Sequence, residues 1–240
     1  MAPVIATSAY TNKTDEHFVF SPEELPSFIE TLATHGGEGR VFYLGFILHE
    51  LGSTWWSAQD GGHIAPIAQW AKKPMYASQF YHSTWSSVDP IPESYRERGE
   101  SGVEEFLDLV NATSVVTFTK IWAKYCIDRP DKYEQVAKYD RFRVFVRIES
   151  ARKSIGYFQK GTGVVKDLRN ALEVKLDAET KDTEVVLKYR YHPHLKVSPE
   201  TAEIFEVPVF TEELGGGRTK PYSFIGLRGV QGIEKYRLSF

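Results

Sequence analysis

The chain has 240 residues, of which 42% are hydrophobic and 14% aromatic, and its formal net charge at pH 7 is −3. This composition supplies a well-buried core and excludes a wholly disordered chain. No segment approaches the roughly 20 apolar residues of a membrane span, and the N-terminal stretch lacks the features of a secretory signal, so we expect a soluble, cytoplasmic protein with no membrane span. The single cysteine, Cys126, excludes an internal disulfide, a CxxC redox pair and a multi-cysteine zinc site.

The charges are distributed unevenly along the chain. Residues 1–125 contain 8 Lys and Arg against 15 Asp and Glu, whereas the remaining residues contain 21 against 17. The acidic part also holds all five tryptophans, namely Trp55, Trp56, Trp70, Trp85 and Trp122. The acidic part of one copy can in principle contact the basic part of another, and we therefore expect a homo-oligomer.

The first predicted helix begins at residues 21–24, where Ser21 can cap the helix and Glu24 can complete a capping box. An apolar stripe follows at helical spacing, and Gly36-Gly37 ends the helix. The stripe consists of Leu25, Phe28, Ile29 and Leu32. Residues 40–49 then form an apolar run bounded by glycines, which is typical of a strand buried on both faces.

The middle of the chain has fewer clear patterns. Residues 52–100 are rich in Ser, Pro, Gly and aromatic residues, and they predict a loop-rich region with a short helix at 64–71. A second capping box, formed by Ser101 and Glu104, predicts another amphipathic helix. The segment 115–127 is ambiguous, because its β-branched start favours a strand whereas residues 121–125 would tolerate a helix, and we expect a strand there.

Beyond residue 128 the hydrophobic pattern changes to period two, which is typical of β-strands. Residues 141–149 alternate most regularly, and residues 154–159 are expected to return as the partner strand. Residues 172–176 and 185–191 are expected to form a hairpin across the polar loop 178–182. Further short strands fit 204–210, 222–227 and 233–240.

Together these elements predict an α+β fold. Its N-terminal half is expected to contain two capped amphipathic helices and a buried strand, and its C-terminal half a mostly antiparallel sheet. The sequence contains no internal repeat, low-complexity segment or long linker. We therefore expect a single domain spanning residues 1–240, with a soft seam near 126–131.

The regular strand supplies the first candidate binding site. Arg141, Arg143 and Arg147 share strand parity with Phe145, so one sheet face is expected to carry three guanidinium groups beside an aromatic ring. Arginine binds phosphates and carboxylates, and the ring could stack on a base of single-stranded nucleic acid. An acidic protein surface, including that of a second copy, is an alternative partner. The simplest interpretation is a solvated strand whose arginines point outward.

Four residues suggest an acid–base site. His49 and Glu50 end the predicted buried strand, and the glycine-rich loop after it returns Asp60 and His63. Two imidazoles and two carboxylates brought together in this way could transfer protons. The segment only superficially resembles HExxH, because Ser53 stands where the second histidine would be. Structural roles for both histidines are the simpler interpretation, and we expect no metal site and no cofactor.

Adjacent tryptophans form the last candidate site. Trp55 and Trp56 lie in a loop, where both rings cannot easily face the same core, so at least one is expected near the surface or lining a pocket. There it could stack on a ring, a sugar or a partner. Packing of both rings into the core by a bend in the chain is the alternative.

The sequence leaves open whether the protein is an enzyme. The leading hypothesis is a non-enzymatic binding, structural or self-assembly protein that uses the arginine-bearing sheet face and the acidic, tryptophan-rich half. The alternative is a cofactor-independent isomerase or hydrolase of small molecules, with an aromatic pocket and His and Glu residues as acid and base.

Overall fold

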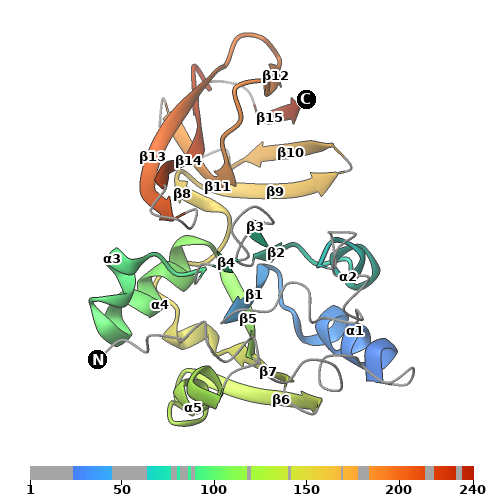
Figure 1. Ribbon diagram of the computed structural model, residues 1–240. Coiled ribbons are helices and arrows are strands. Elements are labelled where there is room, and N and C mark those ends of the chain that lie inside the picture. Colours follow the sequence, from blue (N-terminus) through green and yellow to red (C-terminus); the bar gives the residue numbers. More distant parts are fainter. Residues whose placement is uncertain are drawn as a thin grey trace. The chain divides into compact units, whose positions relative to one another are not determined.

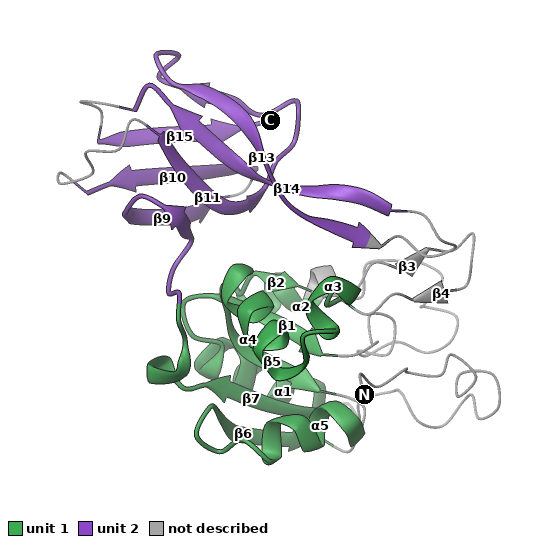
Figure 2. Cartoon of the chain, turned by 90° about the vertical axis from the view of Figure 1, so that its left-hand side faces the viewer, with its two compact units in different colours: residues 1–153, 213–218 green, residues 154–212, 219–240 purple. Residues whose placement is uncertain are grey.

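The computed structural model describes residues 24–44, 64–76, 80–81, 86–87, 90–117, 120–139, 142–168, 170–177, 184–213, 219–230 and 234–240. The fold is α+β, with mostly antiparallel sheets. The chain divides into two compact units (Figure 2). Unit 1 comprises residues 1–153 and 213–218, and unit 2 comprises residues 154–212 and 219–240. The predicted seam at 126–131 lies inside unit 1, while the prediction of a single domain stays a prediction.

Unit 1 is organised around a five-stranded mixed sheet with the strand order β2-β1-β5-β7-β6 (Figure 1). Its strands are β1 (Arg40–Leu44), β2 (Met75–Tyr76), β5 (Ala112–Thr117), β6 (Tyr133–Tyr139) and β7 (Phe142–Arg147). Strand β1 runs parallel to both β2 and β5, whereas β7 runs antiparallel to β5 and β6. The sheet therefore combines a parallel centre with an antiparallel hairpin at one edge.

Helices cover both faces of this sheet. On one face, α1 (Glu24–His35) and α2 (Ile64–Ala71) pack through Phe28, Leu32 and Ile67 onto Val41 of β1 and Val144 of β7. The predicted apolar stripe of the first helix thus faces the sheet. Gly36 donates its backbone N–H to Leu32 O at 2.8 Å and Gly37 has φ of +66°, so the helix ends at the predicted glycine pair.

The opposite face carries α3 (Glu93–Arg96), α4 (Gly99–Leu109) and α5 (Lys120–Ile127). Phe106 of α4 contacts Phe42 of β1 with 6.0 Å between the ring centroids, whereas Val41 packs against α1. Alternate residues of β1 therefore pack on opposite faces of the sheet. Strand β1 is buried along its whole length, as predicted from its continuous apolar run. Within the described ranges, no helix has both the length and the apolar character needed to cross a membrane.

The remaining short elements of unit 1 are the strand pair β3 (Phe80–Tyr81) and β4 (Ser86–Ser87) and the 3₁₀ turn at Glu149–Ala151. Two predicted elements differ from the structure. Helix α4 begins at Gly99, and Ser101 donates its hydroxyl to Arg98 O instead of capping the helix. The segment 115–127 is not a single strand, because β5 ends at Thr117 and α5 begins at Lys120.

The described residues of unit 2 form two four-stranded sheets. One has the order β12-β15-β10-β9, with β12 (Lys196–Ser198), β15 (Lys235–Ser239), β10 (Ala171–Leu176) and β9 (Gly163–Leu168). The other has the order β13-β14-β11-β8, with β13 (Glu203–Glu213), β14 (Thr219–Arg228), β11 (Glu184–Arg190) and β8 (Phe158–Lys160). The three strands predicted after residue 200 are present as β13, β14 and β15.

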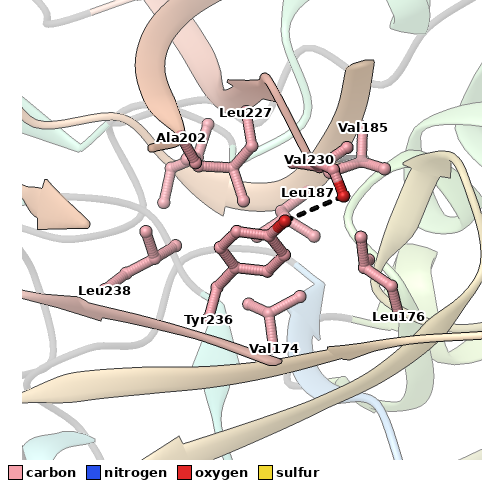
Figure 3. Close-up of a cluster of buried hydrophobic side chains, with 10 residues drawn as sticks. Val174, Leu176, Val185, Leu187, Ala202, Leu227, Val230, Tyr236 and Leu238 are labelled. Carbon is pink, nitrogen blue, oxygen red and sulfur yellow. Dashed lines mark hydrogen bonds between the residues drawn. The ribbon is translucent and has the colours of Figure 1, made fainter. Parts of the chain in front are cut away.

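The core of unit 2 is formed by apolar side chains from both sheets (Figure 3). Val174 and Leu238 come from the first sheet, and Leu187 and Leu227 from the second. Tyr236 is fully buried among them and donates its hydroxyl to Val230 O at 2.9 Å, which satisfies the polar atom inside an apolar cluster.

The two predicted pairings in this region are wrong. Strand β10 pairs with β9 and β15, whereas β11 pairs with β8 and β14. The predicted hairpin partners therefore lie in different sheets and share only the core. Segment 154–159 likewise contributes to β8, which pairs with β11, and the partners of β7 are β5 and β6. Period two identifies a strand and its apolar face, but it does not identify the neighbouring strand.

Removing the buried side chain of Leu238 should destabilise the protein. Leu238→Ala leaves a cavity in the core of unit 2, and we expect the free energy of unfolding to fall by about 2–5 kcal/mol. Arg237→Ala, at the adjacent exposed position, is the matched control and should change it by less than about 0.5 kcal/mol. Urea unfolding of the full chain measures both values. Equal losses would contradict the assignment of the two faces of β15.

Candidate functional site

The predicted arginine-bearing face is only partly exposed. Arg143, Phe145 and Arg147 all lie on β7, but Phe145 is 1% exposed and Arg147 4% exposed. Arg143 is half-buried and donates to Gln135 Oε1 at 2.9 Å. The expectation that these residues share a solvent-facing surface therefore fails at Phe145 and Arg147, because helices cover both faces of the sheet. Arg141 lies outside the described residues.

The other predicted site residues also lie outside the described ranges. They are His49, Glu50, Asp60, His63, Trp55 and Trp56. The acid–base site and the tryptophan contact site thus stay predictions. Among the residues that the structure does describe, no group of three His, Cys, Asp or Glu side chains is arranged to hold a metal ion.

Arg147 is the centre of a buried ion network in unit 1. Its Nη2 lies 2.9 Å from Glu104 Oε2, and its Nη1 lies 2.9 Å from Asp108 Oδ1. Nη1 also donates to Ala112 O at 3.0 Å. Glu104 and Asp108 are four residues apart on α4, which places both carboxylates on one side of the helix. The network therefore ties α4 to β7 through groups that are almost completely removed from water.

Two tyrosines complete the network at Glu104. Tyr125 and Tyr133 donate their hydroxyls to Glu104 Oε1, at 2.8 and 2.5 Å. Burial raises the pKa of both phenols, and the nearby Glu104 carboxylate raises it further, so both stay protonated donors at neutral pH. Burial also raises the pKa of the neighbouring Cys126 thiol, which makes it a poor nucleophile. The cluster is thus suited to holding the fold together rather than to catalysis.

The same helix presents a third carboxylate near the surface. Glu100 contacts Arg129 Nη2 at 3.0 Å and Lys132 Nζ at 2.5 Å. Glu100, Glu104 and Asp108 therefore form one acidic row along α4. The cations that face this row, Arg129, Lys132 and Arg147, all come from the basic part of the chain after residue 125. Part of the charge asymmetry in the sequence is thus neutralised inside unit 1.

An exposed basic surface lies instead on unit 2. The outer side of the β12-β15-β10-β9 sheet, opposite the apolar core, carries five exposed cations among its described residues. We call this surface the basic face, and its cations are Lys166, Lys175, Lys196, Lys235 and Arg237. Alternation along each strand sends the neighbouring residues, such as Val174 and Leu238, into the core.

The strand register brings these cations onto one surface. Glu173 of β10 lies opposite Lys166 of β9 and Arg237 of β15, and Lys175 lies opposite Lys235. Residues paired in this way share a face and are separated by about 4.5–5.5 Å between their Cβ atoms. Lys196 joins the same face, because it lies opposite Ser239, which shares parity with Arg237. Four strands thus contribute to one basic surface.

Glu173 is the acidic side chain at the centre of the basic face. Lys235 Nζ lies 2.9 Å from its Oε2. This hydrogen bond lowers the pKa of the Glu173 carboxyl, and the positive charges of Lys166 and Arg237 lower it further. Lys166, Lys175, Lys196 and Arg237 make no ion pair with a described residue. One carboxylate therefore compensates only a small part of the positive charge.

Sequence reasoning missed this surface although each strand carried a signal. The alternation at 172–176 places Glu173 and Lys175 opposite the apolar side, and the alternation at 235–239 does the same for Lys235 and Arg237. No single segment is as basic as 141–147. The cluster exists only once β9, β10, β12 and β15 are placed side by side, and that order is not written in any one strand.

We compared the chain with protein-family models, with curated proteins and with solved structures, and none of them matches it. The functional assignment therefore depends on the chemistry of the described residues. Two features stand out there. The network around Arg147 is buried and internally compensated, whereas the basic face is exposed and largely uncompensated.

Substitution of Arg147 should test its structural role. Arg147→Ala leaves Glu104 and Asp108 buried without their counter-charge, and we expect the free energy of unfolding to fall by about 3–5 kcal/mol. Arg143→Ala, on the same side of the same strand but half-exposed, is the matched control, with an expected loss of less than about 1 kcal/mol. Urea unfolding followed by far-UV circular dichroism compares them. A small loss for Arg147→Ala would show that its charge is not buried as described.

The pH dependence of stability should reveal the ion pairs of Glu100. Hydrogen bonds from Arg129 and Lys132 lower the pKa of this carboxyl from 4.5 to about 2. A lowered folded-state pKa stabilises the fold above pH 4.5, and that stabilisation is lost as the pH falls toward 2. The effect is small, because 43% of the Glu100 side chain is exposed.

We expect wild type to be more stable than Glu100→Gln at neutral pH, and the difference to shrink between pH 4.5 and 2. Urea unfolding across this window measures the difference. Added salt should reduce it at neutral pH, because the pair is partly solvent-exposed. A difference that stayed constant with pH would contradict the ion-pair explanation.

Proposed function

We propose that this protein is a non-enzymatic binding protein that contacts an anionic partner through the basic face of unit 2. The observation that carries the proposal is the convergence of Lys166, Lys175, Lys196 and Arg237, all exposed, on one side of a sheet. Such a surface attracts anions and increases their rate of association. The proposal keeps the anionic partner expected from the sequence but moves the contact from β7 to unit 2.

The position of the face on a rigid support favours binding. The other side of its strands packs into the apolar core, in which Val174, Tyr236 and Leu238 are fully buried. The cations are thereby held at set spacings, although their flexible stems can still adjust. Lysine is a compact point charge that suits phosphates and carboxylates, and Arg237 adds a planar group that can bind them through two hydrogen bonds.

Two alternatives have less support. Charge-driven self-assembly was expected from the sequence, but three of the cations available for it already form ion pairs within unit 1. They are Arg129, Lys132 and Arg147. Self-association itself stays a prediction. The isomerase or hydrolase alternative depends on His49, Glu50, Asp60 and His63, and the described part of the chain adds nothing in its favour.

Heparin chromatography of the full chain tests the proposal with a generic polyanion. The variant Lys166→Gln/Lys175→Gln/Arg237→Gln should elute at a clearly lower salt concentration than wild type, because it removes most of the free charge on the basic face. The control variant Lys160→Gln/Lys220→Gln/Arg228→Gln loses the same formal charge from the other sheet of unit 2.

The control should elute close to wild type, because each of its cations already lies near a glutamate, at 3.8, 3.5 and 3.7 Å. Circular dichroism and thermal unfolding of both variants check that they fold. Equal shifts for the two variants would show that retention follows net charge alone and would overturn the proposal, as would a wild type that heparin does not retain.

A further inference from the structure

We infer that the partner of the basic face is the phosphate backbone of double-stranded nucleic acid, bound without reading the base sequence. This inference rests on the proposed function and identifies its ligand. It is carried by three properties of the basic face: the spacing of its cations, the scarcity of apolar and aromatic groups on it, and the absence of strong internal compensation among its described residues.

The spacing of the cations fits a linear array of phosphates. Adjacent strands are about 4.8 Å apart, and residues two apart along a strand are separated by about 6.7 Å. The face therefore extends about 14 Å across its four strands. Duplex DNA carries one negative charge per roughly 1.7 Å of its axis, so several phosphates fall within that length. Flexible lysine stems can follow either strand of the duplex.

A single strand fits the face less well. Proteins that bind single strands without sequence preference add aromatic rings on which the bases stack. The paired strand positions on this face are occupied by Lys, Arg, Glu, Ser, Ala, Val and Leu, without an aromatic side chain. Tyr236, the ring within β15, points into the core (Figure 3). The described strand positions of the face thus offer charge but no aromatic ring on which a base could stack, which favours the ligand with the higher charge density.

An acidic protein also fits less well. The cores of protein interfaces are enriched in aromatic residues, Met and Arg and are depleted in Lys. Four of the five cations here are lysines, and the exposed apolar side chain among them is Val164, at 65% exposure. No described residue of the face supplies the large buried anchor that dominates most protein interfaces. Lysine contacts without such an anchor are typical of phosphate-backbone binding.

The acidic charge of the whole chain does not oppose this inference strongly. The sequence pI is near 6.2, which is below the range usual for nucleic-acid-binding domains. At physiological ionic strength, however, charges more than about 8 Å from the ligand are largely screened. Lys166, Lys175 and Arg237 surround Glu173 within that range, so the local sign is positive. The consequence is an affinity that depends steeply on salt.

Fluorescence anisotropy with a labelled 20-base-pair duplex, over a series of NaCl concentrations, tests the inference on the full chain. Four to five phosphate contacts predict a slope of log Kobs against log salt concentration of about −3.6 to −4.5. The variant Lys166→Gln/Lys175→Gln/Arg237→Gln should reduce the magnitude of that slope by about 2.7 and weaken binding at least about 100-fold at 0.1 M salt. Duplexes of unrelated sequence should bind equally well.

The control variant Lys160→Gln/Lys220→Gln/Arg228→Gln should keep the wild-type slope. Duplex binding that depends on sequence, or a single strand that binds as tightly as the duplex, would overturn the inference. If heparin retains the protein but the duplex does not bind, double-stranded nucleic acid is excluded as the partner and the proposed function still holds. Binding of an oligoglutamate peptide instead of the duplex would identify an acidic protein as the partner class. Wild-type protein that binds neither heparin nor the duplex would overturn the proposed function itself.

Discussion

Arg147 carries a positive charge into the interior of unit 1, and the arrangement around it follows from the need to compensate that charge. Burial by itself lowers the pKa of an arginine, but the facing acidic groups more than offset the effect and the pKa of Arg147 is raised. Glu104 and Asp108 supply the counter-charge, and Tyr125 and Tyr133 satisfy the remaining oxygen of Glu104. A buried ion pair is stabilising only when its partners are held in good geometry, so this network fixes how α4, α5, β6 and β7 meet.

This compensation explains why the charge asymmetry of the sequence is a poor guide to the surface. The acidic helix α4 and the cations of residues 129–147 belong to opposite parts of the sequence but face each other in the fold. Their charges largely cancel over distances of a few ångströms. Among the described residues, no acidic helix faces the cations of β9, β10, β12 and β15, and the ion pair found there joins Glu173 to Lys235. The more basic segment of the sequence is therefore partly buried, and a less conspicuous set of lysines forms the exposed face.

Local patterns predicted several of the local elements, although the capping box at Ser101 and the strand over 115–127 were wrong. The stripe at Phe28 and Leu32, the glycine stop and the buried strand β1 were all readable, because each depends on neighbours within one helix or strand. The prediction failed where distant segments decide the outcome. Alternation in β7 correctly placed Phe145 and Arg147 on one face, but whether α4 or water covers that face is a tertiary property. The pairing of β10 with β15 across about 60 residues of chain is likewise set by the shared core, not by either strand alone.

The two arginine environments show why residue type and parity cannot identify a binding surface on their own. Arg147 and Arg237 occupy alternating positions in strands with similar patterns. At Arg147 the side opposite the α1-facing core is covered by a helix that supplies two carboxylates, and the guanidinium becomes part of the interior. At Arg237 the side opposite the core is exposed. The residue opposite Arg237 on β10 is Glu173, which already forms an ion pair with Lys235. A charged strand face therefore becomes available to a partner only where no helix with opposite charges packs onto it. In the described part of this chain, the outer side of the β12-β15-β10-β9 sheet is such a face.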